Sequence, residues 1–180
     1  MAKQFAQLEE PHRKFIEEQH VFFTGSAGPE GRVNISPKGM DSLRVLGPSR
    51  IAWMNLTGSG NETAGHLLEA NRITLMWCSF TTRPLILRAY GTARVLHAGD
   101  AGWDELAALF PAHRSARQIF DVSVEMVQTS CGYAVPFMEY QSERETMQKW
   151  VDDKSDDDIR AYWVEKNQNT IDGKPTGVPV

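Results

Sequence analysis

Apolar residues recur along the chain either in alternation with polar ones or in short continuous runs, and turn-forming residues separate these stretches. Both patterns are typical of β-strands that are buried on one or both faces. The clearest alternation places Phe120, Val122 and Val124 between polar side chains. The pattern predicts strands at residues 21–24, 32–35, 43–46, 51–56, 73–80, 85–96 and 120–126.

Glycine and proline mark the connections between these strands. Residues 25–31 are rich in turn formers and predict a hairpin between the first two strands. The Ser-Pro-Lys-Gly sequence at residues 36–39 predicts a break after the second strand. Gly91 lies inside a stretch that is long for one strand, so we expect a bend or bulge there.

Helical spacing of apolar residues predicts short helices at residues 11–18, 62–70, 103–110 and 147–151, and another that begins near Ser155. Either Ser59 or Asn61 is expected to cap the helix at residues 62–70. Six to eight strands with a few short helices indicate a mainly β protein, an antiparallel barrel with peripheral helices. We expect a barrel domain over residues 1–140. Residues 141–180 are expected to form a helical extension and tail, packed on the same domain or on a dimer partner.

Composition excludes several classes of function. The chain has 180 residues and a formal net charge of −4, and its longest basic run is Arg13-Lys14. These features argue against binding to nucleic acid or an anionic membrane. No apolar run reaches transmembrane length and the first ten residues lack a signal-peptide core, so we expect a cytoplasmic protein. Cys78 and Cys131 lie in apolar contexts and are expected to be buried free thiols.

Familiar catalytic motifs are missing from the sequence. Gly58, Gly60 and Gly65 fit neither a hydrolase nucleophile elbow nor a dinucleotide-binding loop. The five histidines lack the spacing of zinc ligands, so no metal site is expected. No general acid or base can be assigned from the sequence.

Three ordered segments resemble the pyridoxamine 5′-phosphate oxidase-like family of flavin-binding split β-barrels. The first is Arg-Val-Asn-Ile-Ser-Pro-Lys-Gly at residues 32–39. The second runs from Ala-Trp-Met-Asn at residues 52–55, through a loop and a helix, to Ile-Thr-Leu-Met-Trp at residues 73–77. The third is Arg-Pro-Leu-Ile-Leu-Arg-Ala-Tyr-Gly-Thr-Ala at residues 83–93. The Ser-Pro-Lys-Gly variant is similar to an uncharacterised branch of predicted flavin-nucleotide-binding proteins.

The resemblance implies an FMN site and a homodimer with the flavin at the subunit interface. A loop that opens a helix offers backbone N–H groups to the FMN phosphate, and a lysine adds charge. Backbone groups at a strand end can pair with the polar edge of the flavin ring. The expected cofactor-binding residues are Arg32, Val33, Asn34, Ile35, Ser36, Lys38, Asn55, Ser59, Asn61, Thr63, Arg83 and Arg88.

The sequence departs from the family in two respects. Members that oxidise pyridoxamine phosphate carry an Arg-Lys pair at the start of the helix, where this chain has Glu62 and Thr63. The family's C-terminal segment for the substrate phosphate is also missing. We therefore expect an FMN-dependent oxidoreductase that acts on a different small molecule. The alternatives are a non-catalytic flavin-binding or storage module, and a related barrel that binds haem or a deazaflavin.

Overall fold

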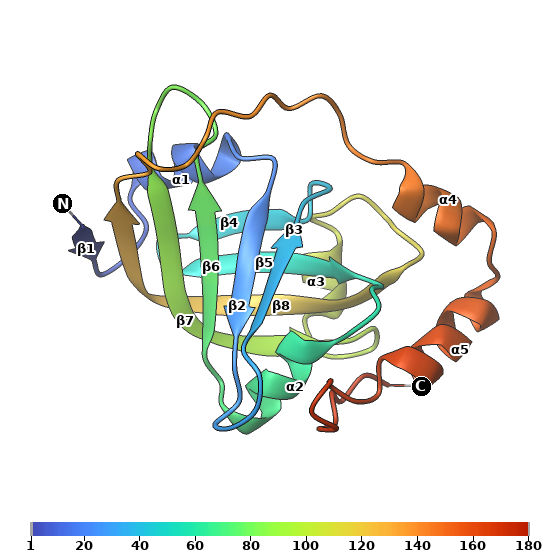
Figure 1. The fold of residues 1–180 in the computed structure, drawn as a ribbon. Coiled ribbons are helices and arrows are strands. Elements are labelled where there is room, and N and C mark those ends of the chain that lie inside the picture. The colour runs from blue at the N-terminus through green and yellow to red at the C-terminus, as the bar shows by residue number, and fades with distance from the viewer. Residues whose placement is uncertain (1, 180) are drawn as a thin grey trace.

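The computed structural model describes residues 2–179 and contains an eight-stranded antiparallel sheet that curls into a split barrel (Figure 1). Hydrogen bonding orders the strands β3-β2-β6-β7-β8-β5-β4, and β1 pairs with residues 127–129 near the C-terminal end of β8. The prediction of a mainly β split barrel is confirmed. The strands are β1 (Lys3–Phe5), β2 (Phe22–Ser26), β3 (Asn34–Lys38), β4 (Leu43–Gly47), β5 (Arg50–Leu56), β6 (Ile73–Cys78), β7 (Ile86–Leu96) and β8 (Ala116–Ser130).

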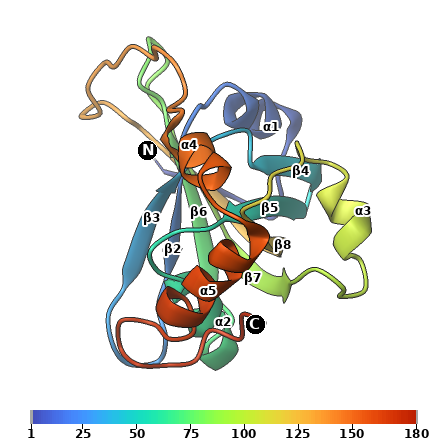
Figure 2. The same cartoon turned by 90° about the vertical axis from the view of Figure 1, so that its right-hand side faces the viewer.

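Five short helices surround the barrel. They are α1 (Glu10–Glu17), α2 (Glu62–Glu69), α3 (Trp103–Ala107), α4 (Thr146–Asp152) and α5 (Asp156–Lys166). Helix α1 and the segment at residues 131–145 lie at one end of the barrel, and α2 lies at the other (Figures 1 and 2). Within residues 2–179, no helix is both long and apolar enough to cross a bilayer.

Aromatic side chains fill the barrel interior. Trp53 stacks on Phe120 with ring centroids 4.4 Å apart, and Phe22 contacts both Trp53 and Trp77 at 6.0 Å. All four rings are buried. Because Trp53 and Phe120 also face each other across β5 and β8, the stack fixes the register of the strands that lead to the site described below.

The C-terminal helices pack on the barrel of their own chain. Val151 and Ile159 are almost fully buried, and the Trp163 indole N–H donates to the Thr57 hydroxyl at 2.8 Å. Residues 168–176 then fold back toward α2, where Lys174 forms an ion pair with Glu69 at 2.8 Å. This loop, which we call the C-terminal loop, lies beside the start of α2.

Several local predictions differ from the structure. The expected break at residues 36–39 is wrong, because β3 continues through Pro37 to Lys38. Proline is tolerated there because β3 is an edge strand, where a missing N–H costs little. Strand β8 is longer than predicted, and β1 was not predicted. Cys78 is buried as expected, whereas Cys131 is exposed.

The bend expected at Gly91 is confirmed. The pairing of β7 with β8 shifts register between Tyr90 and Gly91. A methyl group at Gly91 would overlap the carbonyl of Ser123, so the two backbones approach too closely for any side chain. The shift lets the two longest strands curve around the core.

Candidate functional site

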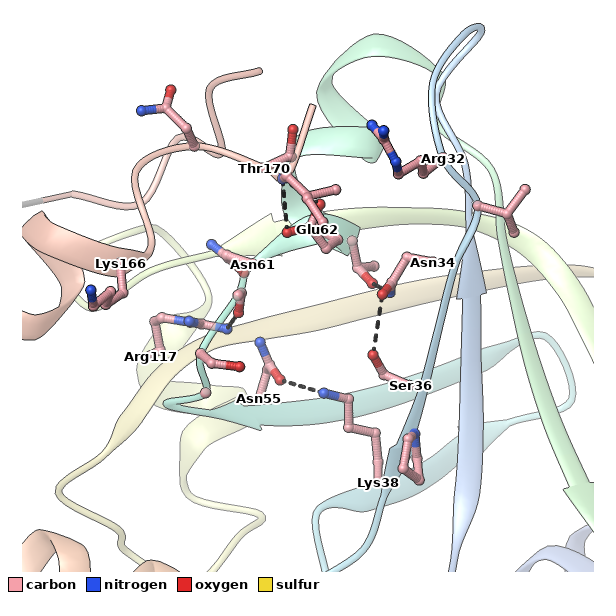
Figure 3. Close-up of a pocket in the computed structure, with 18 of the residues that line it drawn as sticks. Arg32, Asn34, Ser36, Lys38, Asn55, Asn61, Glu62, Arg117, Lys166 and Thr170 are labelled. Atoms are coloured by element: carbon pink, nitrogen blue, oxygen red, sulfur yellow. Dashed lines mark hydrogen bonds between the residues drawn. The ribbon is translucent and has the colours of Figure 1, made fainter. Parts of the chain in front are cut away.

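A cavity of about 700 Å³ lies between β3 and β5, two strands that do not pair with each other (Figure 3). Strand β3 forms one wall, and the end of β5 with the loop at residues 58–61 forms another. Arg117 of β8, Lys166 of α5 and part of the C-terminal loop complete the lining. The cavity therefore occupies the split of the barrel.

Strand β3 presents polar side chains to this cavity. Asn34, Ser36 and Lys38 line it, whereas Ile35 is 69% exposed on the opposite face, as the alternation of a strand requires. The Ser36 hydroxyl donates to the Asn34 side chain at 3.4 Å, and the Asn34 amide donates to the Thr63 hydroxyl at 3.3 Å. These bonds connect the edge strand to the first turn of α2.

Lys38 extends from the end of β3 toward β5. Its ammonium donates to the Asn55 side chain at 3.4 Å and lies 5.1 Å from the centre of the Trp53 ring. Burial, and to a smaller extent the nearby guanidinium of Arg117, lowers the pKa of Lys38 to about 8. The lysine therefore still carries its charge at neutral pH, in a place that disfavours charge.

Arg117 enters the cavity from the opposite side and is 4% exposed. It donates to the Asn167 side chain at 2.5 Å and to the Gly60 carbonyl at 3.2 Å, while its Nε has no partner. Burial lowers the pKa of the guanidinium, which nonetheless stays protonated at neutral pH. Among residues 2–179, neither Arg117 nor Lys38 forms an ion pair with a carboxylate.

The loop before α2 differs from the expected capping arrangement. Asn61 occupies the N-cap position but makes no side-chain cap, because its amide group exchanges two hydrogen bonds with Gln118, at 2.6 and 3.3 Å. Ser59 is exposed at the mouth of the cavity. The first backbone N–H groups of a helix lack partners within the helix, so the start of α2 can offer donors to an anion.

Two charged residues at the mouth are already engaged by the C-terminal loop. Glu62 accepts hydrogen bonds from the backbone N–H of Ile171 at 3.0 and 3.2 Å. Arg32 pairs with Asp172 through both its side chain and its backbone N–H. The Glu62 carboxylate is thus held by the chain's own loop, and the charge of Arg32 is balanced by an aspartate.

The structure brings together most of the residues expected to bind the cofactor, but three lie elsewhere. Ile35 faces away, the Arg83 guanidinium lies 5.8 Å from the centre of the Phe15 ring, and Arg88 donates to the Ser130 hydroxyl at 3.2 Å. The cavity is lined by the other nine: Arg32, Val33, Asn34, Ser36, Lys38, Asn55, Ser59, Asn61 and Thr63.

Sequence reasoning missed Arg117, Lys166 and the C-terminal loop. Arg117 precedes the alternating stretch from which β8 was predicted, and it reaches the cavity only because Gln118 pairs with Asn55 across the sheet. No local motif carries that information. Extending the strand back from Phe120 would have placed Arg117 on a strand but not in a site.

This arrangement can bind an anion beside a surface rich in hydrogen-bonding groups. Besides Lys38 and Arg117, the lining includes Arg32, Lys166 and Glu62, and its remaining polar groups are mainly amides, hydroxyls and backbone. The lining includes no histidine, cysteine, methionine or tyrosine among the described residues. The fold and the site thus define a split β-barrel with a polar cavity, rich in positive charge, in its opening.

Comparison with known proteins identifies the family. The sequence model of the pyridoxamine 5′-phosphate oxidase family matches residues 8–131. A protein of Aspergillus flavus, described as pyridoxamine 5′-phosphate oxidase family protein ustO, is 36% identical over 148 residues, which are 79% of this chain and 59% of that protein. The chain therefore belongs to the pyridoxamine 5′-phosphate oxidase family, although it spans less than two thirds of that relative's length.

Solved structures share the fold at low sequence identity. HupZ of Group A Streptococcus aligns with a TM-score of 0.53 and 18% identity, covering 66% of this chain and 91% of HupZ. A candidate pyridoxamine 5′-phosphate oxidase of Lactobacillus delbrueckii aligns with a TM-score of 0.55 and 20% identity, covering 68% and 94%. At these identities the likeness concerns the fold alone.

The lowered pKa of Lys38 predicts a pH-dependent effect of Lys38→Met on the ligand-free protein. The unfolded chain keeps this proton up to about the ordinary pKa of 10.5, whereas the folded protein releases it at about 8. The folded state is thus penalised below pH 8, and the penalty disappears between pH 8 and 10.5. The free energy of unfolding of Lys38→Met should exceed that of wild type by the largest amount below pH 8, and by progressively less as the pH rises above 8. Urea denaturation from pH 7 to 10.5 measures this, and a pH-independent difference would contradict it.

Proposed function

We propose that this protein binds FMN, with the FMN phosphate in the cavity between Lys38 and Arg117. The observation that carries the proposal is the presence of two cations in the cavity without a carboxylate partner among the described residues. Burying unpaired charge is costly, so a dianion that enters between them is strongly favoured. The unpartnered Nε of Arg117 and the exposed Ser59 hydroxyl supply further donors.

The remaining lining suits the flavin ring. Its pyrimidine edge carries both donors and acceptors, and Asn34, Ser36 and Asn55 offer both in return. A volume of about 700 Å³ is within the usual range for a cofactor pocket. Arg117 also takes the place of the basic pair that the family carries at the start of the helix, where this chain has Glu62 and Thr63.

FMN fits this cavity better than haem does. Haem iron is held by an axial histidine, cysteine, methionine or tyrosine, and the described lining provides none of these. A haem protein would therefore need a different site on this chain.

We further propose that the protein is an oxidoreductase for a small molecule. When bound, FMN supplies the redox chemistry, and the protein supplies orientation and electrostatics. Reduction of the bound flavin by a nicotinamide and its reoxidation by an added acceptor distinguish an enzyme from a storage protein.

The phosphate assignment is tested by comparing FMN with riboflavin, which lacks the phosphate. Lys38→Met should weaken FMN binding by about 1.5–3 kcal/mol, the usual cost of losing a charge-assisted contact, and leave riboflavin binding nearly unchanged. Titration of flavin fluorescence measures both affinities. Lys14→Met, which removes an exposed lysine on α1, is the control and should change neither. Equal losses for FMN and riboflavin in Lys38→Met would contradict the assignment.

We also propose a homodimer in which the flavin lies near the subunit interface. On the face of the sheet opposite the cavity, Ile35 is 69% exposed, and Phe23, Met76 and Tyr90 are half-buried beside it. Val33, just before β3, is 70% exposed and borders both this patch and the cavity. Soluble monomers rarely leave such a patch open, particularly next to an edge strand. Since β3 carries both this patch and the cavity lining, association would place a partner close to the cofactor.

Placing a charge in this patch tests the dimer. Ile35→Glu should shift the protein from dimer to monomer, because a carboxylate cannot be buried unpaired in an apolar interface. Size-exclusion chromatography with light scattering reports the mass. Val164→Glu, at an apolar residue of α5 that is 53% exposed, should remain dimeric. A wild-type monomer that binds FMN tightly would contradict the shared-site arrangement.

A further inference from the structure

A second cavity, of about 850 Å³, adjoins the proposed FMN site. Pro37, Lys38 and Gly58 line both cavities, so the two spaces meet at the end of β3. Most of the opposite wall comes from residues 138–150 and from Tyr162, which lie beyond residues 8–131 that match the family. The shape of this cavity is therefore a property of the C-terminal segment and not of the shared barrel.

Aromatic groups dominate the wall of this cavity. Tyr140 stacks on His20 with ring centroids 3.7 Å apart and planes within 8°, although neither ring is buried. The ring of Trp150 packs edge to face against that of Tyr162, with centroids 5.3 Å apart, and Phe80 adds a further aromatic side chain to the lining. Flat faces of this kind bind planar molecules by stacking.

The charges around the second cavity disfavour an anionic ligand. Glu18, Glu139 and Glu143 lie along it, against Arg144 and Lys38, and Lys38 already faces the proposed phosphate site. The glutamates outnumber the cations here, whereas in the first cavity the cations outnumber the single glutamate, Glu62. A phosphate monoester such as pyridoxamine 5′-phosphate would meet more negative than positive charge.

We infer that this cavity binds an uncharged planar aromatic or quinonoid molecule, which is the small-molecule substrate of the adjacent flavin site. Stacking surfaces, a lack of excess positive charge and direct continuity with the first cavity all favour this class of ligand. The redox role of the molecule rests on the proposed function, whereas its binding does not. The C-terminal segment thus sets the substrate class of this chain.

Binding is tested on the cofactor-free protein with duroquinone, an uncharged planar quinone. Because every ring position is substituted, duroquinone cannot add to the exposed Cys131 thiol. Quenching of tryptophan fluorescence should be saturable, since Trp150 lines the cavity. Excess inorganic phosphate in every quenching titration occupies the proposed anion site of the first cavity, where Trp53 also lies, and under this condition pyridoxamine 5′-phosphate should show no saturable quenching. Tighter binding of pyridoxamine 5′-phosphate than of duroquinone would overturn the inference.

Two tyrosines of the C-terminal segment provide a matched pair of variants. Tyr140→Ala removes a stacking face and should weaken duroquinone binding about tenfold, the effect of losing one aromatic contact with its buried area. Tyr133→Ala removes a more exposed ring of the same segment, outside the cavity, and should leave the affinity unchanged. Equal affinities in the two variants would overturn the inference. So would a change of oligomeric state in Tyr140→Ala, measured by light scattering, because the cavity would then be an interface between copies.

The same samples separate this inference from the proposed function. FMN titration of both tyrosine variants should give wild-type affinity, because neither residue lines the first cavity. Wild-type protein that binds duroquinone but not FMN would contradict the FMN proposal and support the aromatic site. Protein that binds FMN but shows no saturable quenching by duroquinone would overturn the aromatic site alone.

Discussion

Two cations held apart in the opening of the barrel are the constraint around which the rest of the site is arranged. Lys38 and Arg117 reach the same cavity from β3 and β8, and neither has a carboxylate partner among the described residues. A folded chain would ordinarily neutralise such charges or expose them. Instead, Arg117 is fixed by Asn167 and the Gly60 carbonyl, which hold its charge in place without cancelling it. This preformed pair of charges is the basis for the proposal that the cavity receives an anion.

The positions of these charges depend on how the barrel is split. Because β3 and β5 do not pair, the space between them stays open, and the polar face of β3 lines it. The register of β5 against β8 then sets Arg117 beside the cavity, and the Trp53–Phe120 stack holds that register. The C-terminal loop completes the mouth of the cavity. Its Ile171 N–H donates to the Glu62 carboxylate, and its Asp172 carboxylate pairs with Arg32, so both acidic groups near the cavity have hydrogen-bond partners.

Local patterns in the sequence were sufficient to locate strands β2 to β8, the bend at Gly91 and most of one wall of the site, but not the short strand β1 or the full length of β8. These features depend on side-chain alternation, turn chemistry and loop composition, all of which are visible over a few residues. Arg117 could not be found in this way, because its role arises from strand pairing between residues more than fifty positions apart. Either Ser59 or Asn61 was expected to cap α2, but Asn61, at the N-cap position, makes no side-chain cap because a tertiary contact with Gln118 takes its amide. The edge position of β3, which allows Pro37 within a strand, is likewise a property of topology.

The second cavity is the proposed substrate site, next to the proposed cofactor site. The shared barrel provides the anion site, and the segment beyond the family match provides an aromatic wall next to it. In this proposal the barrel holds the cofactor, and the segment beyond the family match selects the ligand that reaches it.

The central claim is that the opening of the barrel is an FMN site. Equilibrium titration of the purified, cofactor-free wild-type protein with FMN, followed by flavin fluorescence, tests it most directly. The account predicts saturable binding in the micromolar range or tighter, with haemin unable to displace the flavin. The absence of binding at micromolar FMN, or displacement of FMN by stoichiometric haemin, would contradict it.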